Sequence, residues 1–246
     1  MSTAVISTAM MSIETPEASR ADERHGRDPI RLVVSCQAAP GHPLRQSPVI
    51  AALARCAELG GAAGVRVDGA ADVAAVRAAT SVPIIGIAKD FGPGRRPYIT
   101  TSFDACAELA RAGADIVAVE ATDESPRVDG FAALVERVHR ELDLPVMADV
   151  ATFEEGMRAH EAGADLVGTT LSGYTRRSAG GPTPDLELVG QLAAGGIAAV
   201  LEGHVSVPAQ LSAAIQAGAW AVVVGTAITD PLALTKTFVQ ALRSNR

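Results

Sequence analysis

The sequence predicts an α/β fold, a single closed barrel in which eight parallel strands alternate with eight helices: the (β/α)8 or TIM barrel. Eight apolar runs rich in Val and Ile do not alternate with polar residues, which is typical of strands covered on both faces. Helix-like stretches separate the runs, and 246 residues suit one such barrel. We expect the barrel to span residues 30–246, after a flexible, disordered N-terminal extension at residues 1–29.

A weak internal repeat supports this alternation of helix and strand. The strings AGADIVAVE at 112–120, AGADLVGTT at 162–170 and AGAWAVVVG at 217–225 share one pattern, and GGAAGVRVD at 60–68 is a looser copy. In each string, a glycine after an Ala-rich helix is expected to supply a left-handed stop before the strand begins. The expected helices cover residues 47–59, 70–79, 103–112, 129–142, 152–162, 184–194, 206–217 and 231–243.

The composition excludes several classes of function. A formal net charge of −7 argues against a nucleic-acid partner, because such binding needs a basic surface. No apolar stretch approaches the length of a membrane span, so no membrane partner is expected. The three cysteines show no CxxC spacing, which fits a reduced, cytoplasmic protein without disulfides. No metal-ligand spacing and no GxGxxG or Walker motif occurs, so neither a metal nor a cofactor is expected.

A polar residue stands at the end of each apolar run. If the runs are parallel strands of one barrel, these residues meet at its C-terminal mouth, where that fold carries its chemistry. They are Gln37, Arg66 and Asp68, Lys89, Glu120, Asp149, Thr170, Glu202 and Thr226. Two long connections, residues 90–101 and 171–184, are expected on the same side, and the second is either a lid with glycine hinges or a plain surface loop.

Lys89 and Glu202 are the candidate catalytic residues. Lys89 follows an apolar run, and burial lowers a lysine pKa toward the range of a general base. Glu202 ends another apolar run, and a lysine and a carboxylate across one mouth can remove and return a proton next to a carbonyl. The alternative for each residue is an ordinary surface ion pair.

The turns after the last two strands are a candidate phosphate site, because barrels of this type often bind phosphate there through backbone N–H groups. Gly203 and His204 occupy the first turn, and Gly225 and Thr226 occupy the second. The glycines are equally compatible with tight turns that bind nothing.

Several strings, read in order, resemble the N-acetylmannosamine-6-phosphate 2-epimerases of bacterial sialic acid catabolism. They are LVVSCQ (32–37), VRVDG (65–69), VPIIGIAK (82–89), AGADIVAVEATD (112–123), MADV (147–150), GTTLSGYT (168–175), LEGHV (201–205), PAQ (208–210) and GAWAVVVGTAIT (218–229). The resemblance runs from about residue 31 to the end of the chain, and GTTLSGYT and IIGIAK are its most specific parts.

The resemblance implies a cofactor-free isomerase acting on a phosphorylated amino sugar, and it leaves a homodimer open. It gives Lys89 the role of the base at C2 and Glu202 a role in ring opening and proton traffic. The implied substrate contacts are Gln37, Arg66, Asp149, Thr170 and Ser172, and the implied phosphate site is Gly203, His204, Gly225 and Thr226. Arg66 is the candidate for stabilising the developing negative oxygen, because a guanidinium is always charged and directional.

Three positions depart from the family pattern. Asp90 replaces an arginine common after the lysine, His204 replaces the arginine of an EGR string, and Asp230 replaces an arginine after the AIT segment. The last two changes remove positive charge near the expected phosphate, so weaker phosphate affinity or a different anionic end of the substrate is a hypothesis. Asp230 before Pro231 also predicts a helix N-cap. The alternatives are another sugar-phosphate isomerase or aldolase on this fold, or a ligand-binding pseudoenzyme.

Overall fold

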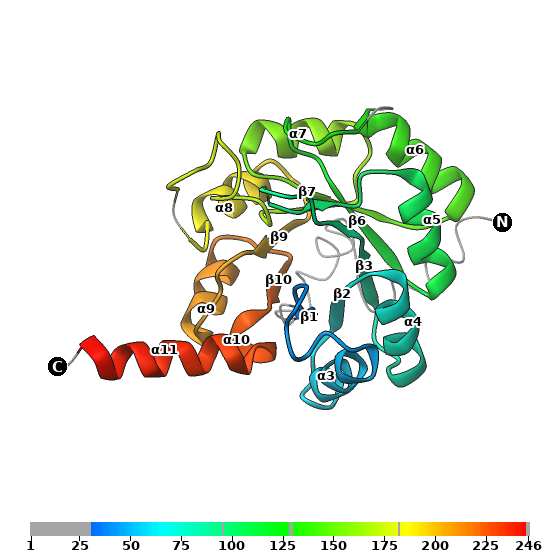
Figure 1. Ribbon diagram of the computed structural model, residues 1–246. Helices are drawn as coiled ribbons and strands as arrows, with labels where there is room; N and C mark the ends of the chain where they lie inside the picture. The colour runs from blue at the N-terminus through cyan, green and yellow to red at the C-terminus, as the bar shows by residue number, and fades with distance from the viewer. Residues whose placement is uncertain (1–30, 95, 128–129, 182, 245–246) are drawn as a thin grey trace, which may run out of the picture.

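The computed structural model is a closed barrel of eight parallel strands surrounded by helices (Figure 1). It describes residues 31–94, 96–127, 130–181 and 183–244, so the expected extension at residues 1–29 lies outside the described residues. The strands follow one another around the barrel in the order β1, β2, β3, β6, β7, β8, β9 and β10, and β10 pairs with β1. The predicted barrel is therefore confirmed. The strands are β1 (Arg31–Cys36), β2 (Gly64–Asp68), β3 (Ile84–Ile87), β6 (Ile116–Glu120), β7 (Val146–Asp149), β8 (Leu166–Gly168), β9 (Ala199–Glu202) and β10 (Ala221–Val224).

Among the described residues, seven helices form a ring around these strands. The ring consists of α3 (Ser47–Leu59), α4 (Ala70–Ala79), α5 (Phe103–Ala112), α6 (Phe131–Leu142), α7 (Phe153–Glu161), α8 (Leu186–Ala194) and α9 (Pro208–Gln216). Where the predicted bounds differ, they differ by one or two residues at the helix ends. Thr152, predicted inside a helix, is instead the N-cap of α7, where its side chain accepts the Glu155 N–H.

The strands are buried on both faces, as their unbroken apolar pattern predicts. Ile85, Ile87, Met147, Val200 and Val223 belong to one cluster of the core. Their chain neighbours on the same strands, including Ile84, Ala148, Leu201 and Val222, pack in two further clusters with the helices. The four glycines of the repeat, Gly61, Gly113, Gly163 and Gly218, have φ values of +89°, +102°, +97° and +92°, so they are the predicted left-handed stops.

The last helix, α11 (Pro231–Ser244), does not join the ring. Figure 1 shows it extending away from the barrel, and the element it mainly contacts is the short helix α10 (Thr226–Thr229). The Asp230 carboxylate accepts the Ala233 N–H at 2.8 Å, which confirms the predicted cap. Phe238 and Leu242 on α11 are 74% and 71% exposed, so this helix presents apolar side chains to solvent.

Two elements at the C-terminal end of the barrel were not expected. After β3 and Ala88, the chain forms a small antiparallel hairpin of β4 (Lys89–Asp90) and β5 (Tyr98–Ile99), in which Lys89 pairs with Ile99. Lys89 therefore lies in this hairpin and not on the barrel strand itself. The second element is α10, which begins directly after β10.

Candidate active site

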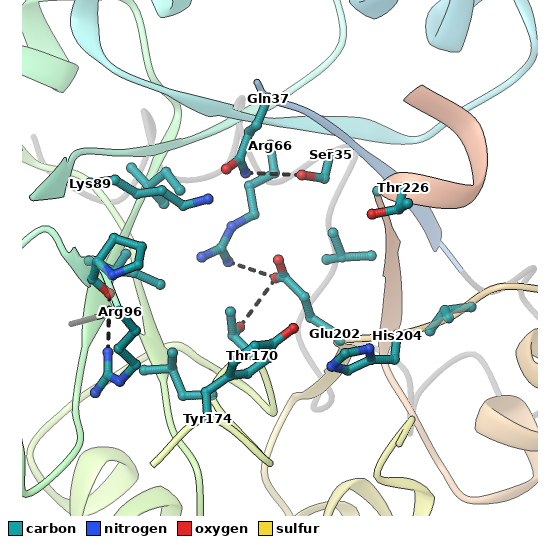
Figure 2. Close-up of a pocket in the computed structure, with 18 residues that line it drawn as sticks. Ser35, Gln37, Arg66, Lys89, Arg96, Thr170, Tyr174, Glu202, His204 and Thr226 are labelled. Atoms are coloured by element: carbon teal, nitrogen blue, oxygen red, sulfur yellow. Dashed lines mark hydrogen bonds and ion pairs between the residues drawn. The ribbon is translucent and has the colours of Figure 1, made fainter. Parts of the chain in front are cut away.

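A cavity of about 360 Å³ opens at the C-terminal ends of the strands (Figure 2). Of the eleven predicted site residues, all but Asp149 and Ser172 line it. The nine are Gln37, Arg66, Lys89, Thr170, Glu202, Gly203, His204, Gly225 and Thr226. The long loops contribute to its wall as predicted, the first through Arg96, Pro97 and Ile99 and the second through Leu171 and Tyr174.

Arg66 forms the charged floor of the cavity. Its side chain comes from β2 and is almost completely buried. Nη1 and Nη2 lie 3.1 and 2.5 Å from the two carboxylate oxygens of Asp149, and Nη1 also lies 2.9 Å from Oε2 of Glu202. Two carboxylates thus hold one guanidinium in place, and this geometry fixes the direction in which Arg66 presents its charge.

Asp149 is a supporting residue beneath the cavity and does not line it. Its carboxyl group is fully buried and binds Arg66 on one side. On the other side, the Thr170 hydroxyl lies 2.6 Å from Asp149 Oδ1 and 3.2 Å from Glu202 Oε2. Thr170 and Arg66 therefore connect the two carboxyl groups in one network.

Glu202 has one oxygen held by the protein and one directed elsewhere. Oε2 contacts Arg66 and Thr170, whereas Oε1 has no hydrogen bond or ion pair with any described residue. Burial raises the pKa of the Glu202 carboxyl, against the opposing charge of Arg66. A raised pKa makes this carboxyl group a stronger base than an ordinary glutamate, which suits a group that accepts and then donates a proton.

Lys89 points into the same cavity. Figure 2 shows its amino group and the Glu202 carboxylate directed toward a common space, with the Arg66 guanidinium between them. Burial lowers the pKa of Lys89 below its ordinary value of 10.5, and the charge of Asp68 opposes that effect. No hydrogen bond or ion pair of its ammonium group is found among the described residues, so the amine is available to a ligand.

The turns after β9 and β10 border the side of the cavity opposite Lys89, and both carry unpaired backbone N–H groups. Gly203 has φ +109° and His204 has φ +57°, and this left-handed backbone turns the chain at the end of β9. In the described part of the chain, no acceptor lies within hydrogen-bonding distance of the N–H groups of residues 203–205 or 225–227. All of these residues except Ala227 line the cavity. Five cavity-lining residues with free backbone amides at one end of a cavity suit an anionic group.

His204 and Tyr174 form a stacked pair beside these turns. Their ring centroids are 5.3 Å apart and their planes differ by 13°. Burial raises the pKa of the Tyr174 phenol, and the Glu202 charge adds to this effect; Figure 2 shows the phenol turned toward Glu202. Sequence reasoning missed Tyr174, although it is part of the GTTLSGYT string and one of two tyrosines in the chain.

Several polar residues expected at the mouth bind the protein instead. The Ser172 hydroxyl donates to Asp185, the N-cap residue of α8, and Ser172 is not brought to the cavity. Glu120 is fully buried and is bound by both terminal nitrogens of Arg96, at 2.7 and 3.1 Å. On the second long loop, Arg176 and Arg177 pair with Glu124 and Asp123.

Comparisons with known proteins show the family to which the chain is similar. The model of a family described as "Putative N-acetylmannosamine-6-phosphate epimerase" matches residues 50–244. A "Putative N-acetylmannosamine-6-phosphate 2-epimerase" of Cutibacterium acnes is 45% identical over 217 residues, which are 86% of this chain and 93% of that protein. A protein of the same name from Thermosynechococcus vestitus is 44% identical over 215 residues, covering 87% and 94%.

Solved structures of known proteins also match this chain. The N-acetylmannosamine-6-phosphate 2-epimerase of Clostridium perfringens matches with a TM-score of 0.81 and 36% identity, over 86% of this chain and 93% of that one. A thiamine phosphate pyrophosphorylase from Pyrococcus furiosus matches with a TM-score of 0.58 at 16% identity, which shows the shared fold alone. Within the described residues, no helix has the length and apolar character needed to cross a bilayer, and no three His, Cys, Asp or Glu residues form a metal-binding group.

Proposed function

This chain belongs to the N-acetylmannosamine-6-phosphate 2-epimerase family, and we propose that it interconverts N-acetyl-D-mannosamine 6-phosphate and N-acetyl-D-glucosamine 6-phosphate. The carrying observation is that an unpaired, partly buried amine and a partly free carboxyl group share one cavity with a fixed guanidinium. Inversion at C2 needs a base, a group that moves protons between the sugar oxygens, and a positive charge for the intermediate. Lys89, Glu202 and Arg66 supply these three.

Ring opening is the first step, and we assign it to Glu202. The carboxyl group takes the proton of the anomeric hydroxyl and delivers one to the ring oxygen, so that the C1–O5 bond breaks and a C1 aldehyde forms. The free Oε1 faces no competing donor among the described residues, while Oε2 stays fixed by Arg66. The raised pKa of Glu202 makes its carboxylate a stronger base for the proton of the anomeric hydroxyl.

Proton transfer at C2 follows. The neutral amine of Lys89 takes the C2 proton, which the neighbouring aldehyde has made acidic, and the electron pair moves onto the aldehyde oxygen to give an enolate. Arg66 stabilises the negative oxygen because its charge is already oriented when the reaction begins. The Lys89 ammonium exchanges its protons with solvent and returns one to the opposite face of C2 after the open-chain sugar has turned that face toward the amine. This step inverts C2, regenerates the neutral amine, and is followed by closure of the ring.

The phosphate group binds, in this proposal, at the turns after β9 and β10. The free amides of residues 203–205 and 225–227 provide donors without any side-chain charge. His204, held by its stack on Tyr174, adds a ring at the same end of the cavity.

The protein forms a homodimer in this proposal, and α11 lies at the interface. Leu234, Phe238 and Leu242 share one face of α11 because they are four residues apart, and all three are exposed. A second copy can cover both α11 helices by the same twofold contact. Light scattering after size exclusion should give the mass of a dimer. Phe238→Asp with Leu242→Asp should give a monomer, whereas Lys236→Asp, on the opposite side of α11, should not; a monomeric wild-type protein would disprove the interface.

Proton NMR in heavy water tests the proposed reaction. Incubation of N-acetylmannosamine 6-phosphate with the protein should remove the C2 proton signal and produce the gluco epimer with deuterium at C2. Absence of exchange would favour a ligand-binding pseudoenzyme. Inactivation by borohydride in the presence of substrate would instead indicate a Schiff base and an aldolase, since the proposed mechanism forms no covalent bond to Lys89.

A further inference from the structure

Asp68 is a buried carboxylate next to the proposed base that the mechanism does not yet use. It ends β2, is 9% exposed and does not line the cavity. Its Oδ1 accepts the backbone N–H of Lys89 at 2.9 Å. The next residue, Gly69, donates its N–H to the carbonyl of Ile87 at 2.8 Å. The end of β2 therefore holds the chain on both sides of Ala88, just where β3 gives way to the hairpin that carries Lys89.

The backbone at Ala88, just before Lys89, is also held by Thr100. The hydrogen bond between Asp68 and Lys89 is therefore one of several that fix this segment. Thr100 donates its N–H to the carbonyl of Ala88 at 2.8 Å and accepts the Ala88 N–H on its hydroxyl at 2.9 Å. Thr100 is fully buried and has φ +46°, a backbone conformation that costs energy for a β-branched residue. The backbone that presents Lys89 is thus held in one geometry.

Among the charges around Lys89, that of Asp68 stabilises the protonated amine most. Burial and the charge of Arg66 lower the pKa of Lys89, while Asp68, Glu202 and Asp149 raise it, Asp68 more than the other two. Glu202 and Asp149 share their negative charge with Arg66, whereas Asp68 has no ion pair within 4 Å among the described residues. Burial raises the pKa of the Asp68 carboxyl, while the Lys89 N–H that it accepts and the charge of Lys89 oppose that effect. Arg45 and Asp72 are the other charged groups that act on Asp68.

We propose that Asp68 is a positioning residue for Lys89, holding its backbone and balancing the positive charge that forms when Lys89 takes the C2 proton. This inference rests on the proposed function. A carbon acid next to an aldehyde is weak, and a lysine weakened by burial and by a neighbouring guanidinium would remove its proton slowly. The buried carboxylate keeps Lys89 basic enough for the transfer without touching the substrate.

The sequence offers a direct measurement, because Lys89 and Lys236 are its two lysines. In protein labelled with ¹³C at the lysine ε-carbon, each lysine gives one signal, and Lys236→Arg assigns them. Titration should place the Lys89 pKa below 10.5 in the wild type. Asp68→Asn keeps an acceptor for the Lys89 N–H but removes the charge, and it should lower the Lys89 pKa further, by roughly one unit. Asp104→Asn, at an exposed position in the first turn of α5, is the matched control and should leave the signal unchanged, since Asp104 is not among the charges that act on Lys89 or Asp68.

Kinetics supply the second readout. In Asp68→Asn, the acid limb of the kcat/KM profile should shift to lower pH by the same amount and maximal kcat should fall, with KM unchanged because Asp68 does not contact substrate. An unchanged Lys89 titration would overturn the proposal, and so would a variant whose KM alone rises. A wild type that exchanges no C2 proton would refute the proposed function instead, while the NMR titration would still test the effect of Asp68 on Lys89.

Discussion

Nη1 of Arg66 lies 2.9 Å from Oε2 of Glu202, so one oxygen of the proposed proton carrier is fixed by the group that stabilises the intermediate. This contact couples two steps of the reaction. It leaves Oε1 for the sugar, and it also keeps the carboxyl group from rotating away when a proton is gained or lost.

Glu202→Gln is expected to reduce turnover by about 10²-fold, because an amide keeps the contact with Arg66 but cannot accept and release the proton of the anomeric hydroxyl. Turnover is measured from the NMR signals of both epimers. Glu136→Gln, at an exposed position on α6, is the matched control and should behave like the wild type. A Glu202→Gln protein with nearly normal turnover would remove this carboxyl group from the mechanism.

Lys89→Ala is expected to abolish deuterium uptake at C2, with a loss of at least about 10³-fold, because no other free amine lines the cavity in the described residues. Circular dichroism should show an unchanged fold, since the truncated side chain ends in a cavity. Lys236→Ala removes the other lysine and is the control, and its deuterium uptake at C2 should equal that of the wild type. Substantial exchange in Lys89→Ala would mean that the base lies elsewhere.

The pH dependence follows from the direction of the Lys89 shift. Lys89 must be neutral to take a proton, so kcat/KM should rise with pH as the ammonium deprotonates. Because burial lowers the pKa of Lys89, the midpoint of that rise should lie below 10.5. The profile of kcat/KM over pH in the wild type measures this midpoint. A rise centred at or above 10.5 would contradict a buried lysine as the base.

Sequence reasoning placed the barrel and most of the cavity correctly because both depend on strand pattern. Unbroken apolar runs identified the eight strands, and the shared C-terminal ends of parallel strands brought Lys89, Glu202 and Arg66 together. The family is confirmed by the comparisons. The roles of the individual site residues remain predictions for the variants described above.

Side-chain partners from distant loops could not be predicted in the same way. Glu120 stands at the end of a strand, as Glu202 does, yet both of its carboxylate oxygens accept hydrogen bonds from Arg96 of the first long loop. Ser172 lies two residues after Thr170, but its hydroxyl donates a hydrogen bond to Asp185 and does not reach the cavity. Each outcome depends on loop conformation, which hydrophobic periodicity does not encode.

Glu120→Ala is expected to destabilise the protein by about 3 kcal/mol, because it breaks a buried ion pair from one side. Glu120 accepts the two bonds from Arg96 and also the Ile99 N–H and the Thr122 hydroxyl. Thermal unfolding should show a Tm lower by roughly 6–12 °C for a chain of this size. Glu136→Ala, which removes an exposed pair with Arg140, should change Tm little; an equal Tm for both variants would show that the buried pair is not stabilising.

His204→Arg is expected to tighten binding of N-acetylmannosamine 6-phosphate by about tenfold, because it adds a permanent charge beside the free amides of the phosphate turns. Binding of unphosphorylated N-acetylmannosamine should not change, since that sugar lacks the dianion. Calorimetric titration of both sugars into the Lys89→Ala protein, with and without His204→Arg, avoids turnover during the measurement. The gain should shrink at high salt.

The control for that variant is His160→Arg, which adds the same charge on the exposed face of α7. It tests whether overall charge, rather than position, improves binding of an anion to a chain with a net charge of −7. Equal gains in the two variants would show a general charge effect. If the unaltered cavity binds both sugars equally, the turns at Gly203 and Gly225 do not hold a phosphate, because free backbone amides that bind a dianion should favour the phosphorylated sugar strongly.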